Sequence, residues 1–478
     1  MELPGKQLGR MNISKARFAL YFGNRGFFPS SHVATAREQM TKVLAALGHE
    51  TLVLDASATR FGAVETPEEG RRYAAFLDEN RGKFDGVILC LPNFGDENGA
   101  AEALKNAKVP ILVHAYPDEM AKLSAQFRRD SFCGKISIMD VFHQLDIPFT
   151  ALKPHVVDPE SAAFAENISY FDRLCRTVAG MREVRVGAFG ARTTAFKTVR
   201  IDEQTLQRRG VTVETYDLAA IIGGVKGIDP ASEPYLTKAA FLQDYSDWTG
   251  IPEQAFVNIC KLGVVLDEII ARDRIDCVAL RCWIELQTQL QISPCVLMSE
   301  LNDRGIAAAC EVDIGSAISM RAISLACNAA PACLDWNNNY YDDPDKCIVF
   351  HCGPTPQAMM IEKGRIEDHQ ILSTVVGKGC SFGCNVGRIK ASPMTYGNLS
   401  TDNGRARMYL GEGEFTGDVV PQEFFGTAGV VKIDNLQDVL LMIGREGFRH
   451  HVSVANGSSA KSLAEALGKY LGYDIVQA

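Results

Sequence analysis

Between residues 16 and 150 the chain alternates short apolar runs with segments whose apolar residues recur every three or four positions. The runs predict buried strands, and the recurring pattern predicts amphipathic helices. Alternation of the two predicts a doubly wound α/β layer around a mostly parallel sheet. The predicted strands are Ala16–Phe22, Thr51–Leu54, Gly86–Leu91 and Pro110–His114, and the predicted helices are His32–Leu47, Pro67–Asn80, Asp96–Asn106 and Lys135–Leu145.

A long helical segment, Ser161–Met181, leads into a second α/β unit with the same alternation. From about residue 332 the helical period fades, and turns rich in Gly, Asn, Asp and Thr become frequent, which predicts an antiparallel, barrel-like β domain. We therefore expect two doubly wound α/β domains, 1–178 and 179–331, and a β-rich C-terminal domain, 332–478. The second unit's predicted elements are Glu183–Phe189, Val211–Tyr216, Glu253–Arg272, Asp276–Leu280, Ile306–Cys310 and Ser316–Asn328, and a late helix is predicted at Ser459–Leu471.

Three polar side chains each follow a short, strand-like apolar run. Glu311 follows Ile306–Cys310, Asp335 follows Ala332–Leu334, and His351 follows Cys347–Phe350. Strand ends can aim several ligands at one point from a rigid scaffold. Two carboxylates and an imidazole suit a divalent transition metal such as Mn or Co, although polar residues also end ordinary strands.

Composition and charge remove several classes of function. The formal charge of −9 argues against a general nucleic-acid binder, which would need a basic face. No apolar run approaches the ~18 residues of a membrane span, and the first 15 residues lack the apolar core of a signal peptide. The 14 cysteines are scattered singly, many inside apolar runs, as buried thiols are in a reducing compartment. Cys380 and Cys384 have no second pair nearby, so no zinc site is predicted there.

Five stretches of the sequence resemble the L-fucose isomerase and L-arabinose isomerase superfamily, most closely its L-fucose isomerase-like branch. They occur in the family's order along most of the chain, and the family's two α/β domains and β-rich C-terminal domain agree with the pattern above. The stretches are Arg129–Lys135 (RDSFCGK), Gly190–Arg200 (GARTTAFKTVR), Cys310–Ala317 (CEVDIGSA), Leu334–Gly353 and Gly447–Val452 (GFRHHV).

The resemblance implies an aldose–ketose isomerase with a bound Mn²⁺, or another divalent ion such as Co²⁺ or Mg²⁺. It implies that Glu311, Asp335 and His451 are metal ligands. His351 matches a ligand of the arabinose isomerases, so the chain mixes features of both branches. Glu311 and Asp335 would also be the acid and base that move protons through an enediol intermediate.

The remaining candidates are substrate contacts. If the 450–451 pair is extended, its rings point to opposite faces, so only one can ligate, and we expect His450 to contact substrate instead. Arg25 and Asn93 occur at strand ends of the first domain, and neither loop carries a GxGxxG dinucleotide motif. Trp283 and Glu285 follow the strand that ends at Arg281.

Two other functions remain open from the sequence. One is a metal-dependent epimerase or lyase on a sugar derivative, and the other is a non-enzymatic sugar-binding protein. We expect a monosaccharide substrate, a cytoplasmic location, and no nucleic-acid or membrane partner. The resemblance also implies a homo-oligomer, a hexamer or trimer, in which the 23–28 loop of one subunit lies near the metal of another. The sugar could be L-fucose, D-arabinose, L-arabinose or an anionic hexose derivative.

Overall fold

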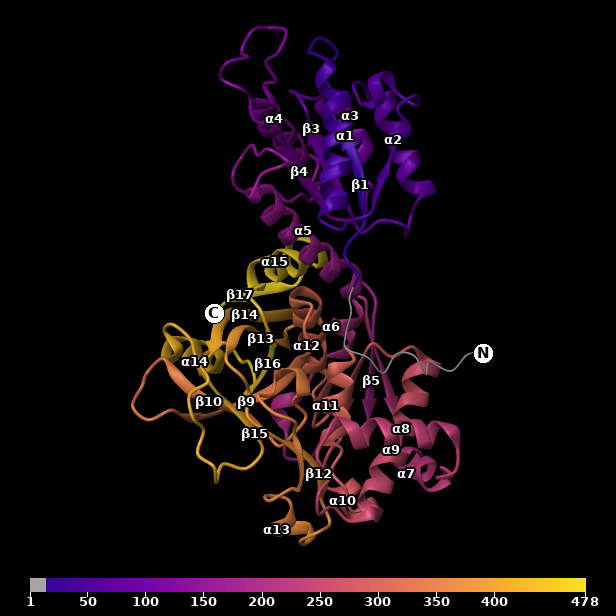
Figure 1. Ribbon diagram of the computed structural model, residues 1–478, viewed down its shortest axis with the longest axis vertical. Helices are drawn as coiled ribbons and strands as arrows, with labels where there is room; N and C mark the ends of the chain where they lie inside the picture. The colour runs from indigo at the N-terminus through magenta and orange to yellow at the C-terminus, as the bar shows by residue number, and fades with distance from the viewer. Residues whose placement is uncertain (1–13) are drawn as a thin grey trace. The chain divides into compact units, whose positions relative to one another are not determined.

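The computed structural model describes residues 14–478, which form two compact units, 14–179 and 180–478 (Figure 1). The N-terminal stretch for which no signal-peptide core was expected lies mostly outside the described residues. Each unit is described by itself below. None of the helices within 14–478 combines the length and apolar character that a membrane crossing requires.

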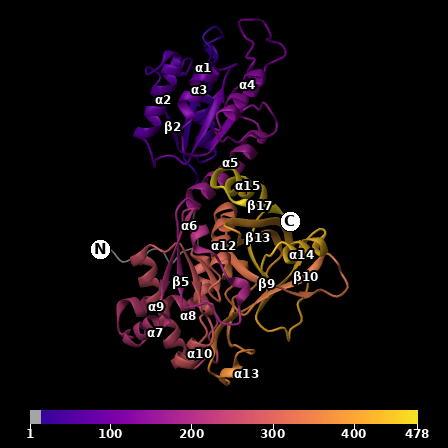
Figure 2. The ribbon, with the colours of Figure 1, turned by 180° about the vertical axis from the view of Figure 1, so that it is seen from behind.

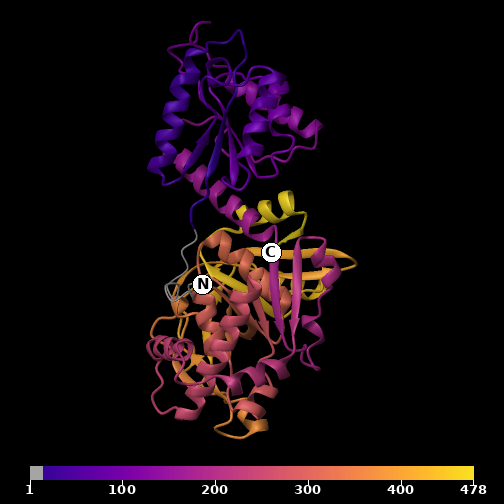
Figure 3. The same ribbon diagram turned by 90° about the vertical axis from the view of Figure 1, so that its right-hand side faces the viewer.

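The first unit is built on a four-stranded parallel sheet in the order β2-β1-β3-β4. Helices cover both faces of this sheet (Figure 3), and its central strands are completely buried. They are apolar throughout because a sheet covered on both faces has no solvent side. The elements are β1 (Phe18–Phe22), α1 (Ser31–Ala46), β2 (Thr51–Val53), a 3₁₀ turn (Arg60–Gly62), α2 (Pro67–Glu79), β3 (Gly86–Leu91), α3 (Glu97–Leu104), β4 (Ile111–Ala115), α4 (Ser131–Gln144) and α5 (Ala162–Met181).

The second unit opens with another parallel sheet, in the order β6-β5-β7-β8. Its last strand, β8, ends at Cys310, so the next residue, Glu311, lies at the carboxyl edge of the sheet. The elements are β5 (Val184–Phe189), a 3₁₀ turn (Lys197–Val199), α6 (Glu203–Gln207), β6 (Val211–Tyr216), α7 (Leu218–Gly227), α8 (Glu233–Tyr245), α9 (Glu253–Asp273), β7 (Cys277–Leu280), α10 (Glu285–Leu290), α11 (Cys295–Asp303), β8 (Ala307–Cys310) and α12 (Ile314–Cys327).

The rest of the second unit is built around a closed six-stranded antiparallel barrel. Its strands pair in the ring β13-β16-β9-β10-β15-β14, and the β13–β14 pairing closes it, which leaves no open edge inside the ring. β17 adds to β14 in parallel. The elements are β9 (Pro331–Asn339), β10 (Lys346–His351), a 3₁₀ turn (Gln357–Met359), β11 (Arg365–Asp368), α13 (Ser373–Val376), β12 (Phe382–Val386), β13 (Ser392–Asp402), β14 (Arg405–Phe415), β15 (Thr427–Lys432), α14 (Leu436–Arg445), β16 (His451–Asn456), α15 (Ala460–Glu465), a π-helical turn (Ala466–Tyr470) and β17 (Asp474–Gln477).

Helix α12 joins the parallel sheet to the barrel (Figures 1 and 2). Its small residues are buried in one hydrophobic cluster with side chains of β5, β8, β13 and β14. Gly315 shows how close the approach is, since a Cβ there would collide with the Arg449 guanidinium and the Leu399 carbonyl. The expected fold class is confirmed, and the domain boundaries at 178 and 331 stay predictions.

Candidate metal centre and active site

Four side chains meet where the second parallel sheet joins the barrel. Glu311 directly follows β8, whereas Asp335, His351 and His451 come from the neighbouring barrel strands β9, β10 and β16. His451 is the direct cross-strand partner of Asp335. His351 comes one residue after Phe350, which pairs with Asp335 on the other side. Strand pairing therefore fixes the position of His451 relative to Asp335.

One side-chain atom of each of these residues has no hydrogen-bond partner. These atoms are Glu311 Oε2, Asp335 Oδ1, His351 Nε2 and His451 Nε2, and all four are buried. His451 Nε2 lies 3.0 Å from Glu311 Oε2 and 3.5 Å from Asp335 Oδ1. Ligand atoms of Glu311, His351 and His451 lie within 4.8 Å of one another. Buried polar atoms normally have partners, so this cluster has the donor set and the unmet bonding of a cation site.

Asp313 determines which nitrogen of His451 faces the cluster. His451 Nδ1 lies 2.7 Å from Asp313 Oδ2, so Nδ1–H donates, and in the neutral ring Nε2 then holds the lone pair. Asp313 itself is fully buried and pairs with the Arg449 guanidinium. Burial alone would raise the pKa of Asp313, but Arg449 and His451 hold it well below its usual value. The ionised carboxylate of Asp313 therefore accepts a hydrogen bond from His451 and fixes the orientation of the His451 ring.

Glu311 is held in place by its backbone and by Trp283. Glu311 and Val312 have φ values of 64° and 58°, a left-handed conformation that non-glycine residues rarely adopt. Trp283 Nε1–H donates to Glu311 Oε1 at 3.1 Å, which leaves Oε2 free to face His451. Burial raises the pKa of Glu311, but the neighbouring His451 and His351 hold it below its usual value.

His351 presents its ring differently from His451. The backbone N–H of Cys352 donates to His351 Nδ1 at 3.0 Å. A neutral ring that accepts at Nδ1 carries its proton on Nε2, so the nitrogen that faces Glu311 is a donor in this conformation. The predicted role as a fourth ligand would need the opposite tautomer.

Both histidines of the 450–451 pair reach Asp335. His450 Nε2 lies 3.6 Å from Asp335 Oδ1, close to the 3.5 Å of His451. The expectation that only one ring could do so is wrong, because β16 begins at His451 and leaves His450 outside the pleated strand. The two differ in burial: the His451 side chain is 1% exposed and that of His450 is 43% exposed.

The segment 190–200 contributes an aromatic wall that the sequence analysis missed. The Phe196 ring lies 5.5 Å from Trp283 and 5.8 Å from His450. Glu285, predicted to contact substrate, pairs with Arg281 through two contacts of 2.6 Å. It is therefore neutralised at the edge of the site.

Arg25 and Asn93 belong to the first unit. Arg25 pairs with Glu97 and donates to the Gly95 carbonyl at 2.8 Å. Asn93 is fully buried and contacts Asn24, so within its own unit it orders the strand-end loops. Their predicted contacts with substrate stay predictions.

The sequence analysis did not assign roles to Asp313 and Arg449, although their positions in the sequence could have indicated them. Both occur in the stretches that carry the family resemblance, two residues from Glu311 and from His451 respectively. Only the structure shows that one buried ion pair joins them. Phe196 also lies in such a stretch, but its residue type gave no hint of a role.

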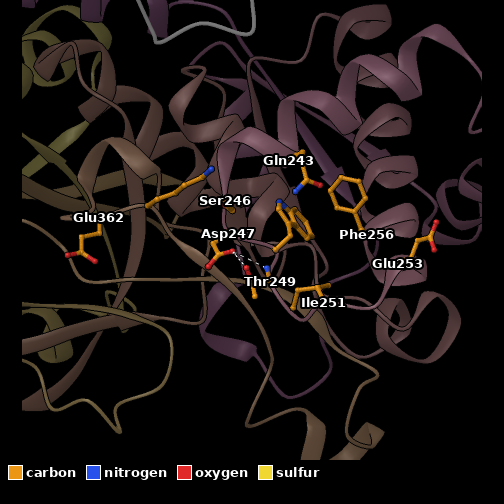
Figure 4. A pocket seen from close by; sticks show the side chains of 10 residues that line it. Gln243, Ser246, Asp247, Thr249, Ile251, Glu253, Phe256 and Glu362 are labelled. Atoms are coloured by element: carbon orange, nitrogen blue, oxygen red, sulfur yellow. Dashed lines mark hydrogen bonds between the residues drawn. The ribbon is translucent and has the colours of Figure 1, made fainter.

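A separate hollow of about 820 Å³ lies near the start of α9 and contains none of the predicted site residues (Figure 4). Part of its polar lining already has hydrogen-bond partners, because Asp247 accepts from the hydroxyl and the N–H of Thr249. Trp248 is largely buried and donates to the Leu242 carbonyl. Nothing in this hollow matches the unsatisfied atoms of the barrel junction.

Comparison with known proteins agrees with this architecture. Residues 19–182 match the family model for the fucose/sulfoquinovose isomerase N-terminal domain, and residues 349–478 match that for the L-fucose isomerase C-terminal domain. The sulfoquinovose isomerase of Alkalicoccus urumqiensis is 22% identical over 84% of this chain and 88% of its own length. The sulfoquinovose isomerase of Priestia aryabhattai is 22% identical over 84% of this chain and 87% of its own length. That of Clostridium sp. (strain MSTE9) is 23% identical over 63% of this chain and 66% of its own length.

The fold and these matches define an aldose–ketose isomerase. The chain belongs to the L-fucose isomerase-like family, as the sequence motifs indicated.

Proposed function

We propose that this isomerase depends on a divalent metal and works through an enediol intermediate at the junction of β8 with the barrel. One observation carries the proposal: ligand atoms of Glu311, His351 and His451 lie within 4.8 Å of one another, Asp335 Oδ1 lies 3.5 Å from His451 Nε2, and each of the four residues has a buried, unsatisfied ligand-type atom. Such an arrangement is costly unless a ligand satisfies it.

We assign Glu311, Asp335 and His451 as the metal ligands. Two carboxylates and one neutral imidazole suit Mn²⁺, with Co²⁺ or Mg²⁺ as alternatives. A bound ion would polarise the carbonyl and hydroxyl oxygens of the sugar and stabilise the charge that develops on them. Asp313 would keep the His451 lone pair directed at the ion by holding the proton on Nδ1.

Proton transfer would fall to the two carboxylates. Aldose–ketose exchange moves one proton between C1 and C2 and another between O1 and O2, so it needs a base and an acid that exchange roles. Trp283 orients Glu311 through its Oε1, and Nε2 of both His450 and His451 lies within 3.6 Å of Asp335 Oδ1. Neither carboxylate pairs with a Lys or Arg side chain among the described residues, so each is free to accept a proton.

We assign His351 as a hydrogen-bond donor to a sugar oxygen. In the present conformation its Nε2 carries the proton, because Nδ1 accepts from Cys352. The predicted fourth-ligand role would require the ring to turn or its proton to move. His450, half-exposed beside Asp335 and Phe196, is placed to contact substrate.

The relatives suggest the substrate to test first. All three compared proteins are named sulfoquinovose isomerase, so we propose an anionic aldose of this kind, with sulfoquinovose as the leading candidate. L-fucose, D-arabinose and L-arabinose are the neutral comparators.

We further propose a cytoplasmic homo-oligomer, a hexamer or trimer, in which the 23–28 loop of one subunit lies near the metal of another. All 14 cysteines are free thiols, which favours a reducing compartment. Phe27 and Met120 of the first unit are 83% and 84% exposed, and large exposed apolar side chains suit a subunit contact. Light scattering would test this, and a fully active monomer would contradict it.

The decisive experiment is an isomerisation assay on chelator-treated protein with no redox cofactor present. Each aldose is incubated with and without added Mn²⁺, and the products are identified by NMR. We expect a ketose to appear, a deuteron from D₂O to enter at C1 or C2, and activity to return only with metal. Full activity after exhaustive chelation would refute the metal dependence, and an epimeric aldose as sole product would refute the assigned reaction.

A further inference from the structure

A cluster of buried thiols lies directly beside His351, and the proposed reaction does not use it. Cys295 begins α11, Cys310 ends β8 and Cys352 follows β10, so three separate elements bring the thiols together. Their exposures are 1%, 0% and 8%. Five buried cysteines lie in this region of the core, Cys282, Cys295, Cys310, Cys352 and Cys384.

Cys352 lies at ligand spacing from both Cys295 and His351. Cys295 Sγ and Cys352 Sγ are 3.5 Å apart, and Cys352 Sγ is 3.3 Å from His351 Nδ1. Cys310 and Cys352 have their sulfur atoms within 4.8 Å of each other and of a His351 ring nitrogen. In a tetrahedral zinc site with Zn–S of about 2.3 Å, neighbouring sulfur atoms are about 3.8 Å apart.

The tautomer of His351 fits a ligand on the sulfur side. Nδ1 accepts the Cys352 N–H, so its lone pair points toward Cys352 and away from Glu311. An ion at Nδ1 would replace that hydrogen bond and would hold the proton on Nε2, where the sugar site needs a donor. Three thiolates and one imidazole form the Cys₃His set of structural zinc sites.

We propose that Cys295, Cys310, Cys352 and Nδ1 of His351 form a second metal site, for Zn²⁺ or a similarly soft divalent ion. Binding would release the three thiol protons to solvent, because only thiolates ligate. This site differs in chemistry from the oxygen-rich centre of Glu311 and Asp335, which suits harder ions. The two sites share only the ring of His351.

Cobalt distinguishes the two sites by spectroscopy. Protein stripped of metal, with its thiols kept reduced, is titrated with Co²⁺ in the absence of oxygen. Co²⁺ bound to thiolates shows an intense near-ultraviolet charge-transfer band, whereas Co²⁺ bound only to carboxylates and imidazole does not. We expect this band at one equivalent per chain and its loss on addition of Zn²⁺. A wild-type protein with no such band in excess Co²⁺ would overturn the proposal, because the thiols would then only pack as small apolar groups.

Substitutions locate the band. Cys310→Ser and Cys295→Ser should abolish it, whereas Cys260→Ser should keep it, since Cys260 is an equally buried thiol in α9 outside the cluster. A band of wild-type intensity in both cluster variants would overturn the assignment. Circular dichroism and thermal melting check each fold, and Cys295→Ala and Cys310→Ala serve as second substitutions if either serine variant fails.

One further variant separates this inference from the proposed function. Asp335→Asn alters the catalytic centre and leaves every thiol in place, so the band should persist while turnover falls. The same band would be seen even if the protein acted on none of the sugars tested. Loss of the band in a folded Asp335→Asn variant would overturn the inference, because the thiolate site would then not be independent of the catalytic centre.

Discussion

Trp283 makes the amide replacement of Glu311 unusually informative. Its indole N–H donates to Glu311 Oε1 at 3.1 Å, while Oε2 faces His451 Nε2 at 3.0 Å. An amide has one acceptor oxygen and one donor NH₂. In Glu311→Gln the oxygen should turn to Trp283, because leaving the partly buried indole unpaired costs about 1–3 kcal/mol, or roughly a 5- to 150-fold preference. The NH₂ group then occupies the ligand position, and metal binding should be lost with the base.

The double variant Trp283→Phe/Glu311→Gln tests that argument. Without the indole N–H the amide can turn its oxygen to the cluster, so metal affinity should partly return. Turnover should not return, because an amide cannot accept the proton. Asp335→Asn should behave like the double variant, since no tryptophan fixes its orientation. Each should lose kcat by at least about 10²-fold, or about 2.7 kcal/mol of transition-state stabilisation, with Mn²⁺ saturating.

The assay is kcat for ketose formation across a Mn²⁺ titration, with metal affinity measured separately by calorimetry. Trp283→Phe alone is the control for loss of the indole. If saturating Mn²⁺ restores Glu311→Gln or Asp335→Asn to wild-type turnover, the carboxylates are ligands only and the proton acceptor lies elsewhere. If the double variant binds metal no better than Glu311→Gln, the orientation argument is wrong.

Three further outcomes are expected. His451→Ala should weaken Mn²⁺ binding more than His450→Ala, because only His451 is buried against Asp313; equal affinities by calorimetry would contradict this. His351→Gln should lower kcat without lowering Mn²⁺ affinity if the ring is a donor, whereas recovery with excess Mn²⁺ would identify it as the predicted fourth ligand. Burial lowers the pKa of His114 to about 3, so the stability that the neutral ring contributes is present above about pH 6.5 and is lost as the pH falls toward 3. Between pH 6.5 and 5 the free energy of unfolding in urea should fall by roughly 2 kcal/mol more for the wild type than for His114→Gln. An equal fall in both proteins would show that His114 does not have this low pKa.

The order of the elements could be predicted from the sequence because the physical signals are local. Strand β3 and strand β6 have the predicted bounds, and α1 and α2 differ from theirs by one residue at most at each end. The barrel-like C-terminal domain was predicted and is confirmed, but the strand order that closes it could not be predicted, since it depends on β13 pairing with both β14 and β16. Hydrophobic alternation fixes which face of a strand is buried but not which strand is its neighbour.

The site was predictable as a set of ligands but not as a geometry. Strand ends identified Glu311, Asp335 and His351, and the family motif added His451. Periodicity could not show that His450 lies outside the strand, because that depends on where pairing with β9 begins. The thiol cluster was equally hidden, since its members are far apart in sequence and each lies in an ordinary apolar context.

The pairing register of the barrel strands β9 and β16 determines which side chains reach the candidate active site. Asp335 and His451 face the same cluster because they are direct cross-strand partners, and a slip of one residue would turn one of them to the opposite face. Glu311 reaches the same point from a different sheet, and Asp313, the N-cap of α12, bonds to His451 and so ties the two together. The helix that buries its small residues between sheet and barrel therefore also sets the ligand geometry. This explains why the E-x-D spacing and the late histidine pair occur together: Asp313 is useful only if His451 arrives opposite it.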